Sequence, residues 1–264
     1  MPELIRSLTV LADGEPLPAG RLALSGREAV GLFPSPFTLR LWNLPEESFL
    51  QLSRAGSVSV QCGDSCLAAG TVTDVCRQTV PEGTLTEAVF SPGLALWEAQ
   101  VSLSVPAGTG MADTVRAILE ASGTGIPLLS VPDPDLISSR SQAFFGRAAE
   151  CIEEVLSGKQ GDGPETAQAM LVPSGLYIIP PSGLPVSLLL SEQDLMDAPV
   201  FAGRKPGGTS AAFMLLSVSA VGFRPGQAVS LSWHGETFTG LIRERQLELW
   251  TSGGPWVNQL LIEL

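Results

Sequence analysis

Short runs of alternating apolar and polar residues are the feature that most limits how this sequence can fold. In Phe37–Trp42 and Ser57–Cys62 apolar side chains recur at every second position, which is the period of a strand with one buried face. A longer run with the same tendency covers Leu94–Val105 and ends before Pro106. The 264 residues include 28 glycines and 21 prolines, which favour many turns. We therefore expect a β-rich chain.

The middle of the chain has the period of a helix instead. Met111, Val115, Ile118 and Leu119 fall on one face of a helix, and Gly123 follows as a typical stop. This pattern predicts one amphipathic helix between two β-rich parts.

A second helix is predicted over Gln142–Leu156. Phe144, Phe145, Ala148 and Ile152 belong to its apolar stripe, and Ser141 precedes it as a possible cap. On this interpretation both phenylalanines are core residues, and Phe145→Ala costs about 3–5 kcal/mol.

Strand patterns then resume and continue to the C-terminus. The candidates are Ala169–Val172, Leu176–Ile179, Ala212–Ser219, Ala228–Trp233, Thr237–Trp250 and Trp256–Leu264. The expected fold is mainly β with a few helices, of the α+β class. We predict a first β-barrel domain over residues 1–105, a helix-containing αβ segment over 106–190, and a second β-barrel domain over 191–264.

Two distant segments have similar sequences. Gly56–Val72 and Gly226–Ile242 each start with glycine, continue with Val-Ser-apolar, turn at glycine with an acidic and a hydroxyl residue, and return through another glycine. A glycine in the returning strand permits the coiling that closes a small barrel. The match predicts equivalent hairpins, Val58–Val72 and Val229–Ile242, in two related barrels. A chance likeness between two hairpins is the alternative.

The charge balance excludes one large class of function. With 15 Lys and Arg against 27 Asp and Glu, the net charge is −12, whereas a protein that holds nucleic acid needs basic patches. The most apolar stretch, Phe213–Phe223, is too short to span a membrane. Since Met1-Pro2-Glu3 is not the basic start of a signal peptide, we expect synthesis in a cytoplasm and no membrane insertion.

Cysteine and histidine offer little to a metal ion. Cys62 and Cys66 have the spacing of half a zinc site, but Cys76 and Cys151 do not form a second pair, and His234 is the sole histidine. Buried thiols are one interpretation of these cysteines. An adventitious disulfide between Cys62 and Cys66 across a tight hairpin is another. We predict no metal site.

No familiar catalytic motif is present either. Gly108-Thr109-Gly110 lacks the lysine of a phosphate-binding loop and is interpreted as a strand-to-helix turn. Cys151 lies on an apolar helix face, which argues against a dyad with His234. The acidic pairs Glu46-Glu47 and Glu153-Glu154 are adjacent in sequence, so their side chains do not converge. We predict no catalytic residues, no cofactor and no enzymatic activity.

The order of these patterns along the chain resembles a known family, the central hub proteins of phage tail baseplates of the kind found in phage Mu and related contractile tails. The resemblance covers most of the chain and rests on Leu41–Leu44, Gly56–Val60, Gly70–Val75, Val101–Val105, Ala112–Leu119, Phe144–Ala148, Gly175–Ile179 and Pro225–Val229.

The resemblance implies a structural role. Such hubs look like two tail-tube-type barrels in one chain, assembled as a homotrimer that presents six similar barrels to the tail tube protein and a three-fold end to the central spike protein. Tape-measure and baseplate wedge proteins are further implied partners. DNA is expected to pass through the channel without specific binding, and an acidic bore repels it, although the acidic balance also serves ordinary solubility. The implied location is the virion tail, assembled in the host cytoplasm.

Two other classes of function stay open at this point. A β-rich module that binds a host-surface glycan or protein would expose aromatic side chains at loop tips, where Trp250 and Trp256 are candidates. A hydrolase would use acids from separate strands, which a sequence alone does not exclude.

Overall fold

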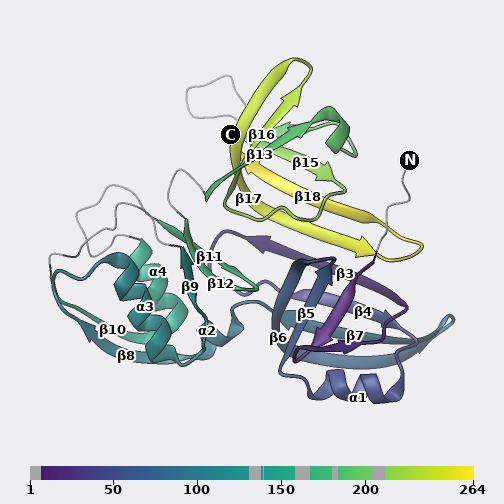
Figure 1. Cartoon of the computed structure of the whole chain (residues 1–264), viewed down its shortest axis with the longest axis horizontal. Coiled ribbons are helices and arrows are strands. Elements are labelled where there is room, and N and C mark those ends of the chain that lie inside the picture. The colour runs from purple at the N-terminus through teal and green to yellow at the C-terminus, as the bar shows by residue number, and fades with distance from the viewer. Residues whose placement is uncertain (1–6, 131–137, 139, 158–166, 180–183, 204–211) are drawn as a thin grey trace. The chain divides into compact units, whose positions relative to one another are not determined.

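The computed structural model describes residues 7–130, 138, 140–157, 167–179, 184–203 and 212–264. The chain divides into two compact units, the first formed by residues 1–29, 35–91 and 185–264 and the second by residues 30–34 and 92–184 (Figure 1). Strands dominate the described residues and helices are few, so the expected mainly-β, α+β fold class is confirmed.

The first unit contains two lobes. Lobe 1 (residues 7–29 and 35–91) holds one helix, α1 (Glu46–Arg54), and the strands β1 (Thr9–Ala12), β2 (Glu15–Leu17), β3 (Arg21–Ala29), β4 (Phe37–Trp42), β5 (Ser57–Cys62), β6 (Ser65–Val80) and β7 (Gly83–Ser91). Lobe 2 (residues 185–264) holds a short 3-10 turn at Glu192–Asp194 and the strands β13 (Leu184–Ser191), β14 (Val200–Ala202), β15 (Phe213–Val218), β16 (Gln227–Trp233), β17 (Glu236–Trp250) and β18 (Trp256–Glu263).

The two lobes repeat one strand arrangement. In space, neighbouring strands follow the order β1-β5-β6-β7-β4-β3 in lobe 1 and β13-β16-β17-β18-β15-β14 in lobe 2. Strands at equivalent positions also occur in the same order along the sequence. The two hairpins singled out in the sequence match in register, since Val58 lies opposite Gly70 and Val229 lies opposite Gly240. Both therefore occupy equivalent places, as expected, but they do so in one continuous sheet and not in two separate barrels.

A shift in strand register also recurs at the same place in each lobe. The pairing of β6 with β7 shifts register between Val72 and Asp74, and the pairing of β17 with β18 shifts between Ile242 and Glu244. Each shift begins two residues after the glycine of the returning strand. Because both β-bulges lie at the same distance from the equivalent glycine, a chance likeness between two hairpins does not explain the match.

The expected separate, closed barrels are wrong for the described residues. These strands form one hydrogen-bonded sheet of 13 strands, whose path is open from β14 to β2. The reason lies in the length of β17: its first half, up to Leu241, pairs with β16, whereas Glu244–Trp250 pairs with β3 of the other lobe. The sheet therefore continues from lobe to lobe instead of closing on itself.

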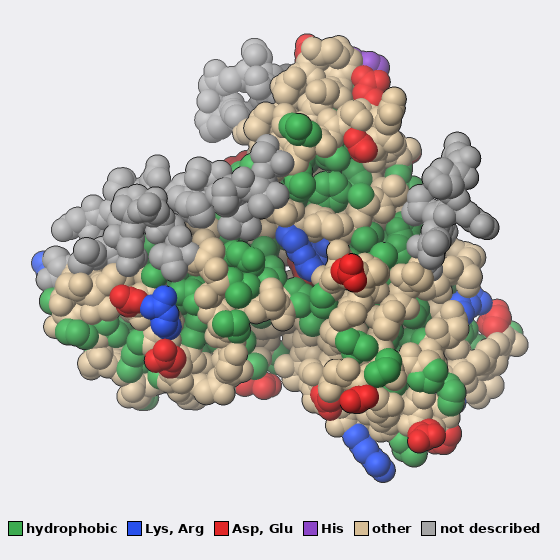
Figure 2. Space-filling view, viewed as in Figure 1, with side chains coloured by type: hydrophobic (Ala, Val, Ile, Leu, Met, Phe, Trp, Pro, Cys, Tyr) green, Lys and Arg blue, Asp and Glu red, His purple; other side chains and the backbone are tan. Residues whose placement is uncertain are grey.

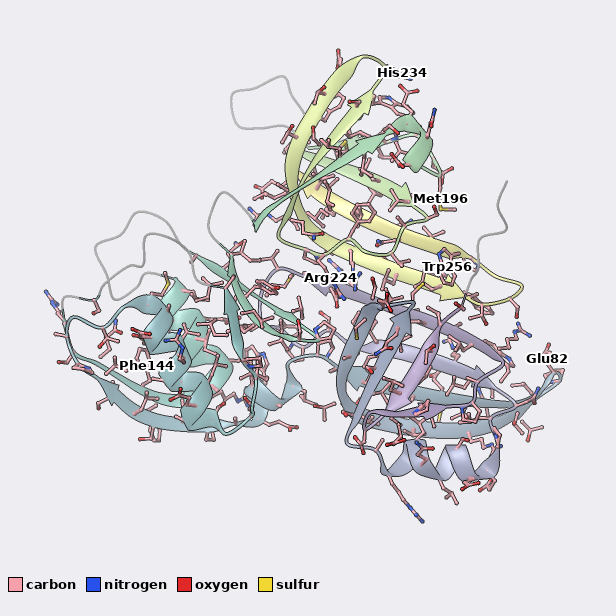
Figure 3. The ribbon with its side chains drawn as sticks, viewed as in Figure 1. Glu82, Phe144, Met196, Arg224, His234 and Trp256 are labelled. Carbon is pink, nitrogen blue, oxygen red and sulfur yellow. The ribbon has the colours of Figure 1, made fainter. Side chains whose placement is uncertain are left out.

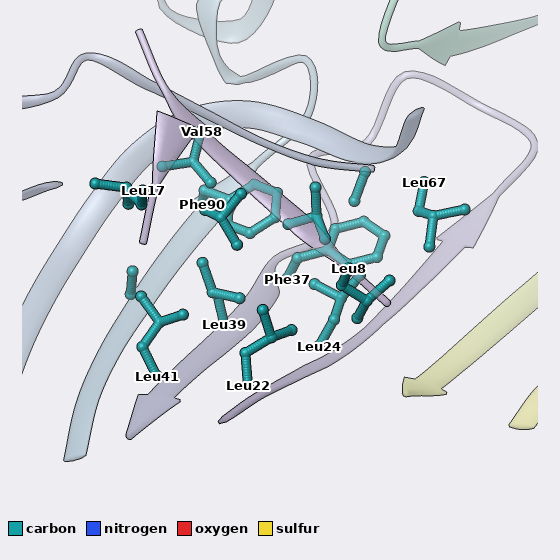
Figure 4. Packing of buried hydrophobic residues seen from close by; sticks show 14 of the residues in the cluster. Leu8, Leu17, Leu22, Leu24, Phe37, Leu39, Leu41, Val58, Leu67 and Phe90 are labelled. Atoms are coloured by element: carbon teal, nitrogen blue, oxygen red, sulfur yellow. The ribbon is translucent and has the colours of Figure 1, made fainter. Parts of the chain in front are cut away.

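The apolar side chains of the first unit gather in two clusters, one in lobe 1 that also takes in Leu247, Leu249 and Trp256 of lobe 2, and one in lobe 2. In lobe 1, the rings of Phe37 and Phe90 stack with centroids 5.6 Å apart among leucines from several strands (Figure 4). The equivalent cluster of lobe 2 is aliphatic for the most part and contains Leu190, Met214, Leu216, Val218, Phe223, Val229, Leu231, Ile242, Leu260 and Ile262.

The second unit is the αβ segment. It contains α2 (Leu94–Glu98), β8 (Gln100–Val105), α3 (Met111–Ser122), β9 (Leu128–Ser130), β10 (Gln142–Arg147), α4 (Ala148–Leu156), β11 (Gln168–Val172) and β12 (Gly175–Ile179). Strands β8 and β10 pair antiparallel, and β9, β11 and β12 form a second small sheet. As predicted, α3 buries Val115 and Ile118, and Gly123 ends it at a φ of 65°.

The predicted helix over Gln142–Leu156 is wrong in its first six residues. Gln142–Arg147 forms β10, and α4 begins only at Ala148, so Ser141 caps no helix. Alternation along β10 buries Phe144, which is 2% exposed, and turns Phe145 outward, 90% exposed. The loss of stability predicted for Phe145→Ala therefore applies to Phe144.

The expected strand over Leu94–Val105 is likewise only half right. Leu94–Glu98 forms α2, which follows Gly93 at a φ of 74°, and the strand begins at Gln100. Among the described residues, no helix has both the length and the apolar character needed to span a membrane.

Candidate assembly interface

The lobe junction, where β3 pairs with β17, is built around a buried cation. Arg245 lies directly opposite Glu28 in the ladder, is fully buried, and donates from Nε to the Glu28 Oε2 at 2.7 Å. Its other nitrogens donate to the backbone carbonyls of Val221 at 3.2 Å, Phe223 at 2.8 Å, and Leu67. One side chain thus ties both lobes together.

A second arginine completes this cluster. Arg224 lies where the two lobes meet (Figure 3) and approaches both oxygens of Glu28 at 3.4 Å. It also donates to the carbonyls of Leu67 and Cys66. Burial lowers the pKa of Arg245 to about 10, against the raising effect of Glu28, so the guanidinium stays charged at neutral pH.

Several strand edges of the first unit lack a neighbour among the described residues, including the outer sides of β2 and β13. Two of these edges matter below: β14, which pairs only with β15, and residues 74–80 of β6, which pair only with β7; we call them the β14 edge and the β6 edge. Unpaired edges present rows of N–H and C=O groups that accept a strand from another chain. Both edges are therefore candidate interaction sites.

The β14 edge is also apolar on its surface. Val200 is 57% exposed, Phe201 39%, and Phe213 and Leu215 of the adjacent β15 are 37% exposed each. Figure 2 shows hydrophobic side chains gathered on the surface over β15 and β18. An exposed apolar patch beside an open edge is typical of an interface between proteins.

The solvent face of the sheet carries balanced or acidic charge near the lobe junction. Arg27 pairs there with Glu244 across the two lobes, and Arg40 pairs with Glu87 at 2.8 Å. Glu248 adds a further acid on the same face of β17. Because a carboxylate sits against each of these two arginines, this surface is a poor binder of phosphate.

The four cysteines form no disulfide bond. Cys62, Cys66, Cys76 and Cys151 are all free thiols, and Cys62 lies opposite Ser65, not Cys66. Burial raises the pKa of the Cys66 thiol, with Arg224 opposing it, and burial also raises the pKa of Cys151. Cys66 and Cys151 are therefore poor nucleophiles.

The other residues that the sequence analysis considered for chemistry, His234 and Gly108-Thr109-Gly110, lie in turns. His234 is exposed in the tight turn between β16 and β17 at a φ of 50°, and its backbone N–H donates to Glu192 at 2.6 Å (Figure 3). Gly108 takes a φ of 86° in the turn from β8 into α3, where the Thr109 hydroxyl donates to the Pro106 carbonyl at 2.8 Å. The interpretation of this segment as a strand-to-helix turn is confirmed.

One acidic pair singled out in the sequence lies at the start of a helix. Glu46 and Glu47 occupy the first turn of α1, where the helix dipole favours them, and Glu46 pairs with Arg77. Within the part of the chain that the structure describes, no three His, Cys, Asp or Glu side chains form a group able to hold a metal ion.

The two tryptophans proposed for a glycan-binding module are not at exposed loop tips. Trp256 begins β18, is 4% exposed, and donates its ring N–H to the Ser219 carbonyl at 3.2 Å. Trp250 ends β17, with its ring centroid 5.4 Å from that of Trp42. This observation removes the aromatic residues on which the alternative depended.

Comparison with known proteins gives one consistent answer. No protein-family profile and no curated protein matches the sequence. Among solved structures, a tail protein from Neisseria meningitidis MC58 matches with a TM-score of 0.71 at 11% identity, covering 98% of this chain and 96% of that one. The 43 kDa tail protein of prophage MuSo2 from Shewanella oneidensis has a TM-score of 0.67 at 10% identity, covering 97% and 96%.

A third structure extends the comparison beyond phages. It is an Escherichia coli component of the type VI secretion system, described as structurally similar to two tail proteins of bacteriophage T4, with a TM-score of 0.63 at 11% identity and coverage of 96% and 76%. At such low identities the likeness concerns the fold. The chain therefore has the fold of phage tail proteins and of their type VI secretion counterparts, and the resemblance seen in its sequence is confirmed at that level.

Proposed function

We propose that this chain is a structural hub protein of a phage or phage-like tail, located in the baseplate. The single observation that carries the proposal is the internal repeat: two lobes of one strand order joined edge to edge in a continuous sheet. A chain that already joins two like units, and whose described strands leave two equivalent edges open, the β14 edge and the β6 edge, is suited to a ring of such units.

In its full form the proposal is a homotrimer. Three chains with two lobes each supply six similar positions to a six-fold tail tube protein at one end and a three-fold surface to a central spike protein at the other. Tape-measure and wedge proteins are further proposed partners. The domain limits 1–105, 106–190 and 191–264 remain part of this proposal.

DNA is proposed to pass through the ring without specific binding. The support is electrostatic: the net charge is −12, and two arginines on the solvent face of the sheet, Arg27 and Arg40, are each paired with a glutamate, whereas Arg21 on the same face lies over the ring of Trp42. Such a surface offers phosphates little to hold. We propose no enzymatic activity, a place in the virion tail, and assembly in the host cytoplasm.

Electron microscopy of the assembled particle tests the proposal. The expected result is a closed three-fold ring of this chain, coaxial with the tail tube. A location off the tail axis, or a bore lined by basic side chains, contradicts it. Co-expression with the tube and spike proteins of the same particle provides a simpler test, since both are expected to co-purify with the hub.

A further inference from the structure

We propose that the β14 edge of one copy adds to the β6 edge of the next copy, so that the contact between subunits repeats the lobe junction inside each chain. This inference deepens the proposed function and rests on it. It names the contact surfaces and their register, which the proposed ring alone does not specify.

The first step is the equivalence of β6 and β17. Aligning Gly70 with Gly240, and the two bulges that follow, places Cys76 at the position of Gln246 and Gln78 at that of Glu248. In β17 the segment Glu244–Trp250 pairs with β3. The same segment of β6 has β7 on one side and no described strand on the other.

The second step is the equivalence of β14 and β3. Each is the outermost strand of its lobe, beside β15 and β4 respectively. Following the ladders inward, Gly26 lies opposite Phe37, and Phe37 lies opposite Phe90. In lobe 2 the corresponding positions are taken by Phe201, Met214 and Ile262. Strand β14 of lobe 2 is therefore equivalent to β3 of lobe 1. No described strand pairs with the outer side of β14.

The register between copies follows from these two equivalences. Inside the chain, Arg27 lies opposite Gln246 and Ser25 lies opposite Glu248. Transferred to the open edges, Ala202 lies opposite Cys76 and Val200 lies opposite Gln78. The side-chain faces agree, because Cys76 and Gln78 point to solvent, as do Ala202 and Val200.

The surfaces are also compatible chemically. The β14 edge consists of Val200, Phe201 and Ala202 and carries no charge, so no like charges meet on pairing. In the β6 edge, Arg77 is already paired with Glu46. Pairing adds ladder hydrogen bonds and covers the exposed Val200 and Phe201. The contact is head to tail, which gives a ring if the rotation closes and a filament if it does not.

The native Cys76 provides a direct test. Directly opposed residues of antiparallel strands have Cα atoms about 4.5–5.5 Å apart, which is within the range of a disulfide. The variant Ala202→Cys is oxidised by air with copper phenanthroline, over rising protein concentration and after co-expression with the tail tube protein. We expect a disulfide-linked ladder on a non-reducing gel that ends at the trimer. Mass spectrometry is expected to find a peptide in which Cys76 is joined to the introduced thiol at position 202.

Three controls make the test specific. The double variant A202C/C76S is expected to give no such bond. Mixed with the unaltered chain, it is expected to give one linked dimer and nothing larger, since each partner then carries only one half of the contact. The variant Phe201→Cys places the thiol on the opposite face of β14 and is expected to link poorly to Cys76.

The outcomes separate this inference from the proposed function. A three-fold ring seen by microscopy, without the bond from Cys76 to position 202 in the Ala202→Cys variant, overturns the register and leaves the hub standing. Absence of both ring and bond, in the isolated and the co-expressed protein, overturns both. A ladder that continues past the trimer supports the edge pairing and contradicts the closed ring.

Discussion

Lobes 1 and 2 have the same strand order but stabilise equivalent positions with different side chains. Arg245 of β17 corresponds to Val75 of β6, and its partner Glu28 corresponds to Gly203. The junction inside the chain is thus fastened by a buried ion cluster, whereas the edges that we propose to meet between copies have neutral residues at that place. The permanent junction inside the chain and the proposed contact between copies can therefore share one backbone geometry and differ in whether a buried ion cluster stabilises it.

The buried cores of the two lobes also differ in their side chains, except at one polar position. Phe37 and Phe90 of lobe 1 correspond to Met214 and Ile262 of lobe 2, so aromatic packing is replaced by aliphatic packing. One polar position is kept: Thr86 and Asn258 are equivalent, and both are fully buried. The Asn258 amide donates to the Ala220 carbonyl at 3.1 Å. Backbone topology is therefore common to the lobes, and side-chain chemistry is not.

The strongest test of this contrast is Arg245→Ala against Val75→Ala. Removing Arg245 leaves Glu28 buried with only the more distant Arg224, and several carbonyls lose a donor. The free energy of unfolding is expected to fall by about 3–5 kcal/mol, whereas Val75→Ala costs roughly 1 kcal/mol. Urea unfolding followed by tryptophan fluorescence measures both. Equal losses would show that the ion cluster does not fasten the lobes.

The second test compares the two cores. Phe90→Ala is expected to cost about 3–5 kcal/mol and Ile262→Ala about 2–5 kcal/mol, because both side chains are fully buried and leave cavities. Since the lobes share one sheet, each variant should lower the same calorimetric transition. A separate, earlier transition in Ile262→Ala, with the rest of the trace unchanged, would mean that lobe 2 unfolds by itself.

The third test concerns the glycine of the returning strand in lobe 2. A Cβ at Gly240 would overlap the Glu263 carbonyl oxygen and lie 2.7 Å from Cγ2 of Ile262. Gly240→Ala is therefore expected to destabilise by about 1–3 kcal/mol. Gly20→Ala in lobe 1 is the control, because no atom lies within 4 Å of its Cβ position. Its stability is expected to stay equal or rise by up to about 1 kcal/mol.

The repeat was predictable because it is encoded locally. Glycines at Gly70 and Gly240 and two-residue turns leave a pattern that a single chain displays, and both predicted hairpins form. The pairing of β3 with β17 was not predictable, since it joins residues more than 200 positions apart, and no local period reports such a contact. The open edges were missed for a related reason, because a strand edge is open only with respect to partners that are distant in sequence.

The error at Phe144 and Phe145 has a local cause. Two adjacent phenylalanines followed by a helical stripe fit a helix period, but a strand in which one side chain points inward and the other outward accommodates them equally. Gly146, at a φ of 134°, was the available signal, because that backbone conformation interrupts a helix between the strand and Ala148. The exposed Phe145 shows that an apolar residue type alone does not establish burial.

The smallest expected effect concerns one aspartate in each lobe. Hydrogen bonds from the backbone of Ser57 and Gly56 lower the pKa of Asp13 below its usual value, and the backbone and hydroxyl of Ser191 lower that of Asp194. A carboxylate whose pKa is lower in the folded state stabilises the fold above the pKa of the unfolded chain. This stabilisation is lost as the pH falls through the lower, folded-state value.

Asp13→Asn and Asp194→Asn are therefore expected to reduce stability slightly at neutral pH and to match the unaltered chain in strong acid. Urea unfolding from neutral pH down to about pH 2 measures the difference, which should shrink only below the usual aspartate pKa of about 3.9. Since Asp13 ties the end of β1 to the start of β5 whereas Asp194 closes a local turn after β13, the Asp13 variant is expected to lose more. An Asp194 variant with the larger loss would show that lobe 2 depends more on its local turn than lobe 1 depends on its strand contact.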